Sequence, residues 1–195
     1  MPRGGAKDHE AGSALGLLEC GSLARGLEAA DAAWKAAPVR PLWVRAIEPG
    51  VLLLAFTGTV DAVREAVRAG RAVLAEALRA ELLLPGPHPQ LLRALRSTAI
   101  PEAGCRALGL LECATVAATL RAADAAVKHA EVELFHLRVS GGMGGRGLVC
   151  LAGTEADVES AVHTGAELAE RQQALVRASI ITEPAGGLLA AAARI

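Results

Sequence analysis

Aromatic residues are almost absent from this sequence of 195 residues, which contains no tyrosine, two tryptophans and two phenylalanines. Proteins that bind single-stranded nucleic acid stack the bases on such side chains. The net charge of −1 also offers no excess of cations to a polyanion. The sequence therefore predicts no nucleic-acid partner, and the core must be filled mainly by Ala, Leu and Val.

Long apolar segments and metal-binding patterns are missing as well. No apolar run approaches the roughly 18–20 residues that a membrane-spanning helix needs, and we expect the polar segment 1–12 to be a flexible tail. The four cysteines form no C-x-x-C pair, and the five histidines show no H-x-x-x-H or H-E-x-x-H spacing. These absences predict a cytoplasmic protein with free thiols, no membrane partner, no metal site and no cofactor.

The sequence does contain an internal repeat with an offset of 93 residues. The segment Ala-Leu-Gly-Leu-Leu-Glu-Cys occurs at 14–20 and again at 107–113, and 16 of the 24 positions in 14–37 are identical in 107–130. A period this long is a whole small domain and not a solenoid unit of roughly 20–50 residues. We therefore predict a tail at 1–12, a first domain at 13–100 and a second domain at 101–195. A domain this small buries a limited share of its surface, so we expect each half to need a neighbour.

Both copies show the same order of predicted elements, β-α-β-β-α-β-α, which is typical of a ferredoxin-like α+β sheet. The predicted strands of the two copies lie at 13–20, 42–47, 51–56 and 81–84, and at 106–113, 134–139, 148–152 and 179–182. The predicted helices lie at 22–37, 60–80 and 89–96, and at 115–130, 155–177 and 187–194. The fold class predicted is α+β, with two tandem ferredoxin-like domains.

The segment Gly142–Gly147 matches the dinucleotide-binding pattern G-x-G-x-x-G. That pattern needs a strand before it and a helix after it, so that the phosphate meets the N-terminus of the helix. A strand follows here, and we interpret the segment as a hairpin turn that needs positive φ or a close approach of another backbone. Gly58 and Gly153 lie at an offset of 95, so the second copy contains two extra residues, which we place in this turn.

No catalytic site is predicted, and we expect that the protein is not an enzyme. Glu19-Cys20 and Glu112-Cys113 are neighbours on strands, so their side chains point to opposite faces and cannot act as a pair. No other set of acid, base and nucleophile converges. Near the ends of their helices, Lys35 and Lys128 interact favourably with the helix dipole, and their presence in both copies indicates a contact role.

In their order, these motifs resemble those of bacterial microcompartment shell proteins, and specifically the tandem, trimer-forming class of unpermuted, single-layer type. Single-domain members open with a strand like Ala-Leu-Gly-Leu-Leu-Glu, followed by a helix that ends Ala-Asp-Ala-x-x-Lys-x-Ala, as at Ala30–Ala37 and Ala123–Ala130. A glycine-containing pore turn, a helix that begins like Asp61-Ala62-Val63 and a Pro-x-Pro-His turn like Pro85–His88 complete the pattern. The resemblance covers about residues 13–96 and 106–194.

The resemblance implies a flat disc made of three chains. In such a pseudohexameric homotrimer, two fused domains per chain replace the six subunits of a cyclic hexamer, and closure by rotation is usual for soluble homo-oligomers. The disc would tile with hexameric and pentameric shell proteins into a microcompartment shell in the cytoplasm, and small metabolites would cross a central pore. The alternative that the sequence leaves open is a regulatory module of duplicated ferredoxin-like domains that holds a small ligand between its halves.

The resemblance assigns the pore to the turn after the second strand of each copy. With Gly50 aligned to Gly145, the pore-lining residues are Glu48, Pro49, Gly50, Met143, Gly144 and Gly145. Three Glu48 carboxylates around one axis would repel one another unless Arg45 or Arg146 lies close enough to compensate their charge. We expect a small opening that passes polar metabolites and disfavours anions.

Two positions differ from the family pattern. Some propanediol-type trimers hold an iron–sulfur cluster through a cysteine in the first pore turn, where this chain has Glu48-Pro49-Gly50, so we predict no cluster. Single-domain members have Pro-Arg-Pro-His at the rim, and its Arg helps contact between discs, whereas this chain has Gly86 and Glu183 at those places. Lys35 and Lys128 would remain as edge contacts between discs, and insertion among hexamers of another shell protein would fit this difference.

Overall fold

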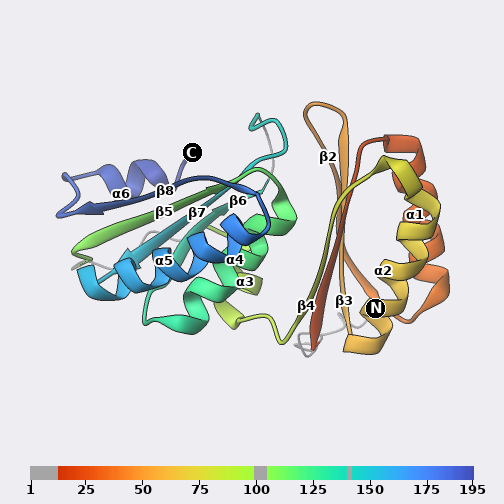
Figure 1. Ribbon diagram of the computed structural model, residues 1–195, viewed down its shortest axis with the longest axis horizontal. Coiled ribbons are helices and arrows are strands. Elements are labelled where there is room, and N and C mark those ends of the chain that lie inside the picture. The colour runs from red at the N-terminus through yellow and green to blue at the C-terminus, as the bar shows by residue number, and fades with distance from the viewer. Residues whose placement is uncertain (1–12, 99–104, 140–141) are drawn as a thin grey trace, which may run out of the picture.

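Two four-stranded antiparallel sheets, one from each repeat, organise the chain (Figure 1). The structure is a computed structural model that describes residues 13–98, 105–139 and 142–195. Sheet A has the strand order β2-β3-β1-β4, and sheet B has the equivalent order β6-β7-β5-β8. This arrangement confirms the α+β class and the duplication predicted from the sequence.

Each repeat contributes the predicted series of elements. The first consists of β1 (Ala14–Cys20), α1 (Leu23–Ala36), β2 (Arg40–Ile47), β3 (Val51–Gly58), α2 (Val60–Leu74), the 3-10 turn η1 (Ala75–Ala77), β4 (Leu78–Pro85) and α3 (Pro89–Ala94). The second consists of β5 (Ala107–Cys113), α4 (Val116–His129), β6 (Glu133–Arg138), β7 (Gly147–Gly153), α5 (Glu155–Arg171), β8 (Leu175–Thr182) and α6 (Leu188–Ala192).

The predicted ends of the two long helices were wrong. We expected helices to residues 80 and 177, but α2 ends at Leu74 and α5 at Arg171, and the strands that follow begin at residues 78 and 175 instead of 81 and 179. The backbone turns out of the helix through Ala75 and Gln173, whose φ values are 45° and 55°. Leu and Ala alternating with Arg suit a helix and a strand alike, so periodicity did not reveal this early stop.

Serine and threonine start the four long helices. The hydroxyls of Ser22, Thr59, Thr115 and Thr154 accept hydrogen bonds from the backbone N–H three residues on, at 3.1–3.4 Å. At Thr154 the hydroxyl also donates to the Asp157 carboxylate at 2.6 Å. Such caps satisfy donors that the first helical turn leaves without an acceptor, and they fix where each helix begins.

The strand registers locate the two extra residues of the second copy. Trp43 and His136 occupy equivalent places beside Ala55 and Cys150, so the offset is 93 up to β6 and 95 from β7 onward. The insertion therefore lies between Arg138 and Gly147, in the glycine-rich connection, as predicted. Gly142, Gly144 and Gly145 have φ values of 71°, 62° and 88° there, which fits a turn that requires glycine.

The two repeats fill one packing position in opposite ways. In the first, Gly26 of α1 lies under Leu52 of β3, where an added Cβ would come within 2.6 Å of the leucine Cδ2. In the second, the equivalent helix residue is the buried Thr119 and the equivalent strand residue is Gly147. A Cβ at Gly147 would lie 2.2 Å from Thr119 Oγ1 and 2.8 Å from its Cβ. Thr119 has little freedom to yield, because its hydroxyl donates to the Thr115 carbonyl at 2.7 Å.

Replacement of Gly147 by alanine should destabilise the protein because the new methyl group overlaps Thr119. We expect the Gly147→Ala variant to lose about 1–3 kcal/mol of unfolding free energy, the usual cost of overpacking. Urea unfolding followed by circular dichroism measures this loss. Gly153→Ala, at the other end of β7, is the matched control, since its Cβ would meet neighbours only at 3.4 Å or beyond. Equal stability of the two variants would contradict the packing argument.

Candidate functional site

The six residues predicted to line a pore lie on two hairpin turns. Glu48, Pro49 and Gly50 connect β2 to β3, and Met143, Gly144 and Gly145 lie in the connection from β6 to β7. Both turns extend from the same side of the molecule, at the top of Figure 1. An added Cβ at Gly50, Gly144 or Gly145 would have open space around it. The turn 48–50 is exposed throughout, whereas in the second turn Gly144 is exposed, Met143 half-buried and Gly145 buried. Both turns thus lie on one side of the chain.

Neither arginine that could have compensated Glu48 binds it. The Arg45 guanidinium lies over the Trp43 ring, 5.0 Å from the ring centroid. Arg146 Nη1 lies 3.0 Å from the Glu112 carboxylate. Glu48 is exposed and takes part in none of the ion pairs between described residues. Its negative charge therefore stands uncompensated at the tip of the first turn.

The two repeated lysines form equivalent ion pairs in different surroundings. Lys35 Nζ lies 2.6 Å from Asp31, and both side chains are exposed. Lys128 Nζ lies 2.5 Å from Asp124, whose side chain is only 5% exposed. Asp124 is buried because the first domain covers it, and it also accepts a hydrogen bond from the backbone N–H of His88 at 2.7 Å. The lysines lie in the last turns of α1 and α4, as predicted.

The contact between the two domains is a site that the sequence alone did not reveal. Helices α1 and α2 cover one face of sheet A, and the second domain covers much of the other (Figure 1). On that second face, Leu15, Leu17 and Leu82 are fully buried in one core cluster with residues of α4, including Ala117 and Leu120. The interior of the chain therefore continues across both domains.

Glu19 anchors this interface. It is 2% exposed, and its Oε1 accepts a hydrogen bond from the backbone N–H of Ala117, in the first turn of α4, at 2.6 Å. Burial raises the pKa of Glu19 to about 7, although the N–H groups of Ala117 and Val116 and the charge of Arg79 act in the opposite direction. A carboxyl group on β1 thus caps a helix of the other domain.

A second polar contact fixes the rim turn of the first domain to the second domain. Gln90, at the start of α3, donates from Nε2 to the Val132 carbonyl at 2.9 Å and accepts from the Leu134 N–H at 2.8 Å. Together with the bond from His88 to Asp124, this amide holds the turn against α4 and β6. The repeated Asp of the sequence motif therefore has a defined partner. The polar positions conserved between the two copies, Glu19 and Asp124, were the available signal for the interface.

The cysteines of the described residues lie apart from one another, on strands or at the start of the second domain. Cys20, Cys113 and Cys150 are buried on strands, and Cys105 is half-buried. Among residues 13–98, 105–139 and 142–195, no group of three or more potential metal-ligating side chains occurs. None of the helices in these ranges is both long and apolar enough to cross a membrane. The absence of a cofactor remains a prediction, which rests on the lack of a thiol in the turn 48–50.

The raised pKa of Glu19 predicts a pH-dependent stability that Glu19→Gln removes. In the unfolded chain this carboxyl titrates near its ordinary value of 4.5, and in the folded protein near 7. Between these values the folded state binds more protons, so its unfolding free energy falls as pH rises from about 4.5 to about 7. The unfolding free energy of Glu19→Gln, taken relative to that of the wild type, should therefore be higher at pH 8 than at pH 5.

Urea midpoints at the two pH values, at one fixed protein concentration, test this expectation. Glu170→Gln is the control, because Glu170 is an exposed residue on α5 and its variant should follow the wild type at both pH values. The same pH dependence in Glu19→Gln and in the wild type would show that Glu19 does not titrate in this range.

Comparison with known proteins identifies the repeat. The family model described as "BMC domain" matches residues 14–87 and again 107–184. The microcompartment shell protein PduT of Citrobacter freundii is 37% identical over 171 residues, which cover 88% of this chain and 92% of that protein. A crystal structure of a microcompartment protein from Desulfitobacterium hafniense superposes with a TM-score of 0.80 at 38% identity, and covers 91% of this chain and 98% of its own.

A more distant structure belongs to the same group. A fused, permuted hexameric shell protein of the RMM microcompartment has a TM-score of 0.61 and 26% identity, with 82% of this chain and 84% of that chain covered. The first repeat begins with β1 and α1 and the second with the equivalent β5 and α4, as expected for the unpermuted type. The matches confirm the resemblance drawn from the sequence motifs and do not favour the regulatory alternative. The chain belongs to the BMC-domain family, with two such domains in tandem.

Proposed function

We propose that this protein is a structural shell component of a bacterial microcompartment, and that three copies close into a pseudohexameric ring. Two BMC domains in one chain and the relatives named as shell proteins support this function. The observation that carries the trimer is a mismatch in burial. The domain interface forms once within the chain, between sheet A and α4. The equivalent surfaces, on sheet B and on α1, are exposed.

Helix α1 exposes the surface that helix α4 buries. In α4, Val116, Leu120 and Val127 are only 0%, 0% and 6% exposed, because they pack against the first domain and the core of the second. Their counterparts in α1, at an offset of 93, are Leu23, Leu27 and Trp34, which are 44%, 59% and 39% exposed. Solvent-exposed apolar residues at helical spacing indicate a contact that one chain does not complete.

Sheet B exposes the complementary surface. Leu17 and Glu19 of β1 are buried at the domain interface, whereas their counterparts Leu110 and Glu112 of β5 are partly exposed. A second chain can therefore place its α1 on this sheet in the way that α4 lies on sheet A. Such a head-to-tail contact forms a closed ring if the rotation closes. Three chains supply the six domains of a hexamer-like ring.

In this ring the two hairpin turns surround the axis. Both extend from one side of the chain, as neighbouring turns around a common axis must (Figure 1). Three Glu48 carboxylates and three glycine turns, residues 143–145, would line the pore through which small metabolites pass. Lys35, Lys128 and the rim turns at Gly86 and Glu183 would meet hexameric and pentameric shell proteins at the edge. The role is structural and not enzymatic, and its place is the shell of a cytoplasmic compartment.

The oligomeric state tests the proposal. Light scattering coupled to gel filtration should give a mass of three chains for the wild type and of one chain for Leu27→Asp, because the variant buries a charge without a partner in the contact. Ala156→Asp is the control for an added carboxylate, since Ala156 is exposed in the first turn of α5, where the first repeat already has Asp61. A monomeric wild type, or a trimer that tolerates Leu27→Asp, would contradict the proposed ring.

The charge at the pore gives a second expectation. Glu48→Gln removes three carboxylates from the axis of the trimer, so anionic metabolites should cross the shell faster while uncharged ones cross at the same rate. Flux measurements on shells that contain the protein and a hexameric partner would show this. Glu155→Gln serves as the control, because Glu155 is exposed and follows the end of β7 that is opposite to the turn. Unchanged anion flux in Glu48→Gln would refute the role of Glu48.

A further inference from the structure

Glu112 and Glu19 occupy equivalent positions in the repeated heptamer but have different partners. Glu19 is buried and accepts the Ala117 N–H at the start of α4. Glu112 lies on the open part of sheet B, its side chain is 30% exposed, and it accepts a hydrogen bond from Arg146 Nη1 at 3.0 Å. The single chain thus leaves one of two equivalent helix-capping carboxylates without a helix.

The start of α1 is the matching unoccupied helix end. The first N–H groups of a helix have no acceptor within the helix. Ser22 caps the N–H of Arg25 at 3.4 Å, which leaves the N–H groups of Leu23 and Ala24, the counterparts of Val116 and Ala117. In α4 these are the positions whose N–H groups approach Glu19. An acceptor from another chain would complete α1 in the same way.

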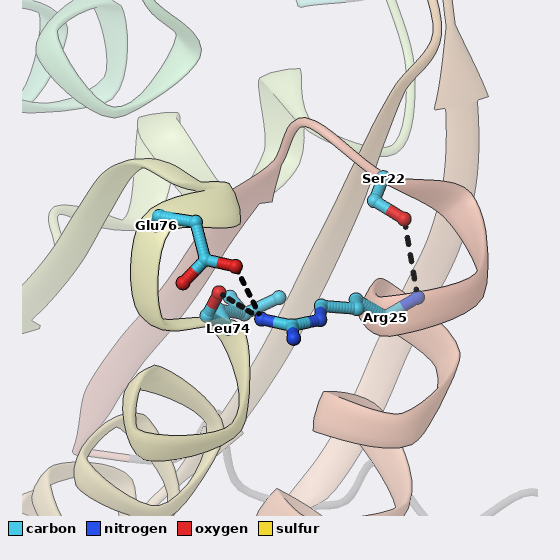
Figure 2. A network of polar contacts seen from close by, with 4 residues as sticks. All are labelled: Ser22, Arg25, Leu74 and Glu76. Atoms are coloured by element: carbon cyan, nitrogen blue, oxygen red, sulfur yellow. Dashed lines mark hydrogen bonds and ion pairs between the residues drawn. The ribbon is translucent and has the colours of Figure 1, made fainter.

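Arg25 holds this helix end in place. Figure 2 shows its guanidinium between the Leu74 carbonyl, at 3.3 Å, and the Glu76 carboxylate, at 3.0 Å, while its backbone N–H donates to Ser22. These contacts join the first turn of α1 to the end of α2. The ion pair is largely exposed and contributes little to stability, so its effect is limited to joining the two helix ends.

We propose that Glu112 of one chain accepts hydrogen bonds from the backbone N–H groups of Leu23 and Ala24 of the next chain, while Arg146 keeps its contact with the same carboxylate. This inference rests on the proposed trimer and names the bond that joins its chains. A carboxylate at a helix N-terminus is stabilised by the N–H groups and by the helix dipole. The acceptor at the start of α1 is therefore the carboxylate of a second copy of this chain.

Charges around the proposed contact also favour a second copy. Arg121 of α4 donates to the Glu81 carbonyl at 3.3 Å within the chain, and its counterpart in α1 is Glu28. Across the strands, Ala80 is the partner of Glu19, and Arg177 is the partner of Glu112. The contact between chains would thus bring the acidic Glu28 towards the basic Arg177, a pairing that the contact within the chain does not contain.

Arg146 distinguishes this contact from the one inside the chain. Its counterpart in the first repeat, at the offset of 95, is Val51. Among the ion pairs of the described residues none involves Glu19, on which Arg79 acts only through its charge at longer range. Burial of a carboxylate together with a bound guanidinium costs less free energy than burial of a carboxylate alone. Arg146 directly follows the glycine turn, and its N–H donates to the Met143 carbonyl at 3.1 Å. Glu112 therefore connects the second pore turn to the ring contact.

Dissociation of the full-length trimer tests the proposal. Loss of a helix-capping carboxylate costs about 1 kcal/mol, so Glu112→Ala should raise the dissociation constant of each contact about fivefold, and of the ring with three contacts about a hundredfold. Analytical ultracentrifugation over a dilution series measures these constants. The exposed Glu170→Ala variant is the control and should match the wild type. Glu112 is partly exposed in the single chain, so its removal leaves the core intact.

The outcomes separate this inference from the proposed function. If the wild type does not form trimers, the proposed function itself fails. If it does, and Glu112→Ala dissociates as Glu170→Ala does, the capping contact is overturned while the ring stands. Arg146→Ala should weaken the trimer less than Glu112→Ala, and the double variant should be no weaker than Glu112→Ala alone, because Arg146 acts through Glu112. Additive effects of the two substitutions would overturn the role of Arg146.

Discussion

The bond from the Ala117 N–H to the buried Glu19 carboxylate determines how the two halves of this protein are arranged. It places the first turn of α4 on sheet A, and the apolar residues Leu15, Leu17 and Leu82 then share one core with the second domain. Burial of a carboxyl group is costly, which explains its raised pKa. The helix N-terminus offsets part of this cost, because its N–H groups bind the carboxylate.

The two copies of the fold are equivalent in architecture but not in what surrounds them. The two hydrogen bonds of the Gln90 amide, to Val132 and Leu134, have no equivalent between chains. Gly187 occupies the position of Gln90 after β8, and Pro41, which has no N–H, occupies the position of Leu134. The contact inside the chain is therefore the more elaborate of the two. The contact between chains needs no such hydrogen bonds if ring closure supplies the remaining stability, since each of the three contacts reinforces the others.

Local sequence patterns predicted the elements, the duplication and the hairpin turns, because alternation, helical spacing and glycine act over a few residues. The early ends of α2 and α5 could not be predicted, since Ala75 and Gln173 adopt positive φ without being glycine. The domain interface could not be predicted either. In the sequence Glu19 is an isolated acid on a predicted strand. Its partner Ala117 gives no side-chain signal, because the bond uses the backbone N–H. Only the identity of the two heptamers indicated that the glutamate has a common role.

The central claim is that one kind of domain contact, made once within each chain, is made again between chains. Electron cryomicroscopy of the assembled particle tests it most directly. The account predicts a threefold ring in which Leu27 and Trp34 of each α1 are buried on β5 and β8 of the next chain, with residues 48–50 and 143–145 alternating around the axis. A twofold assembly, or a ring in which this face of α1 stays exposed to solvent, would contradict it.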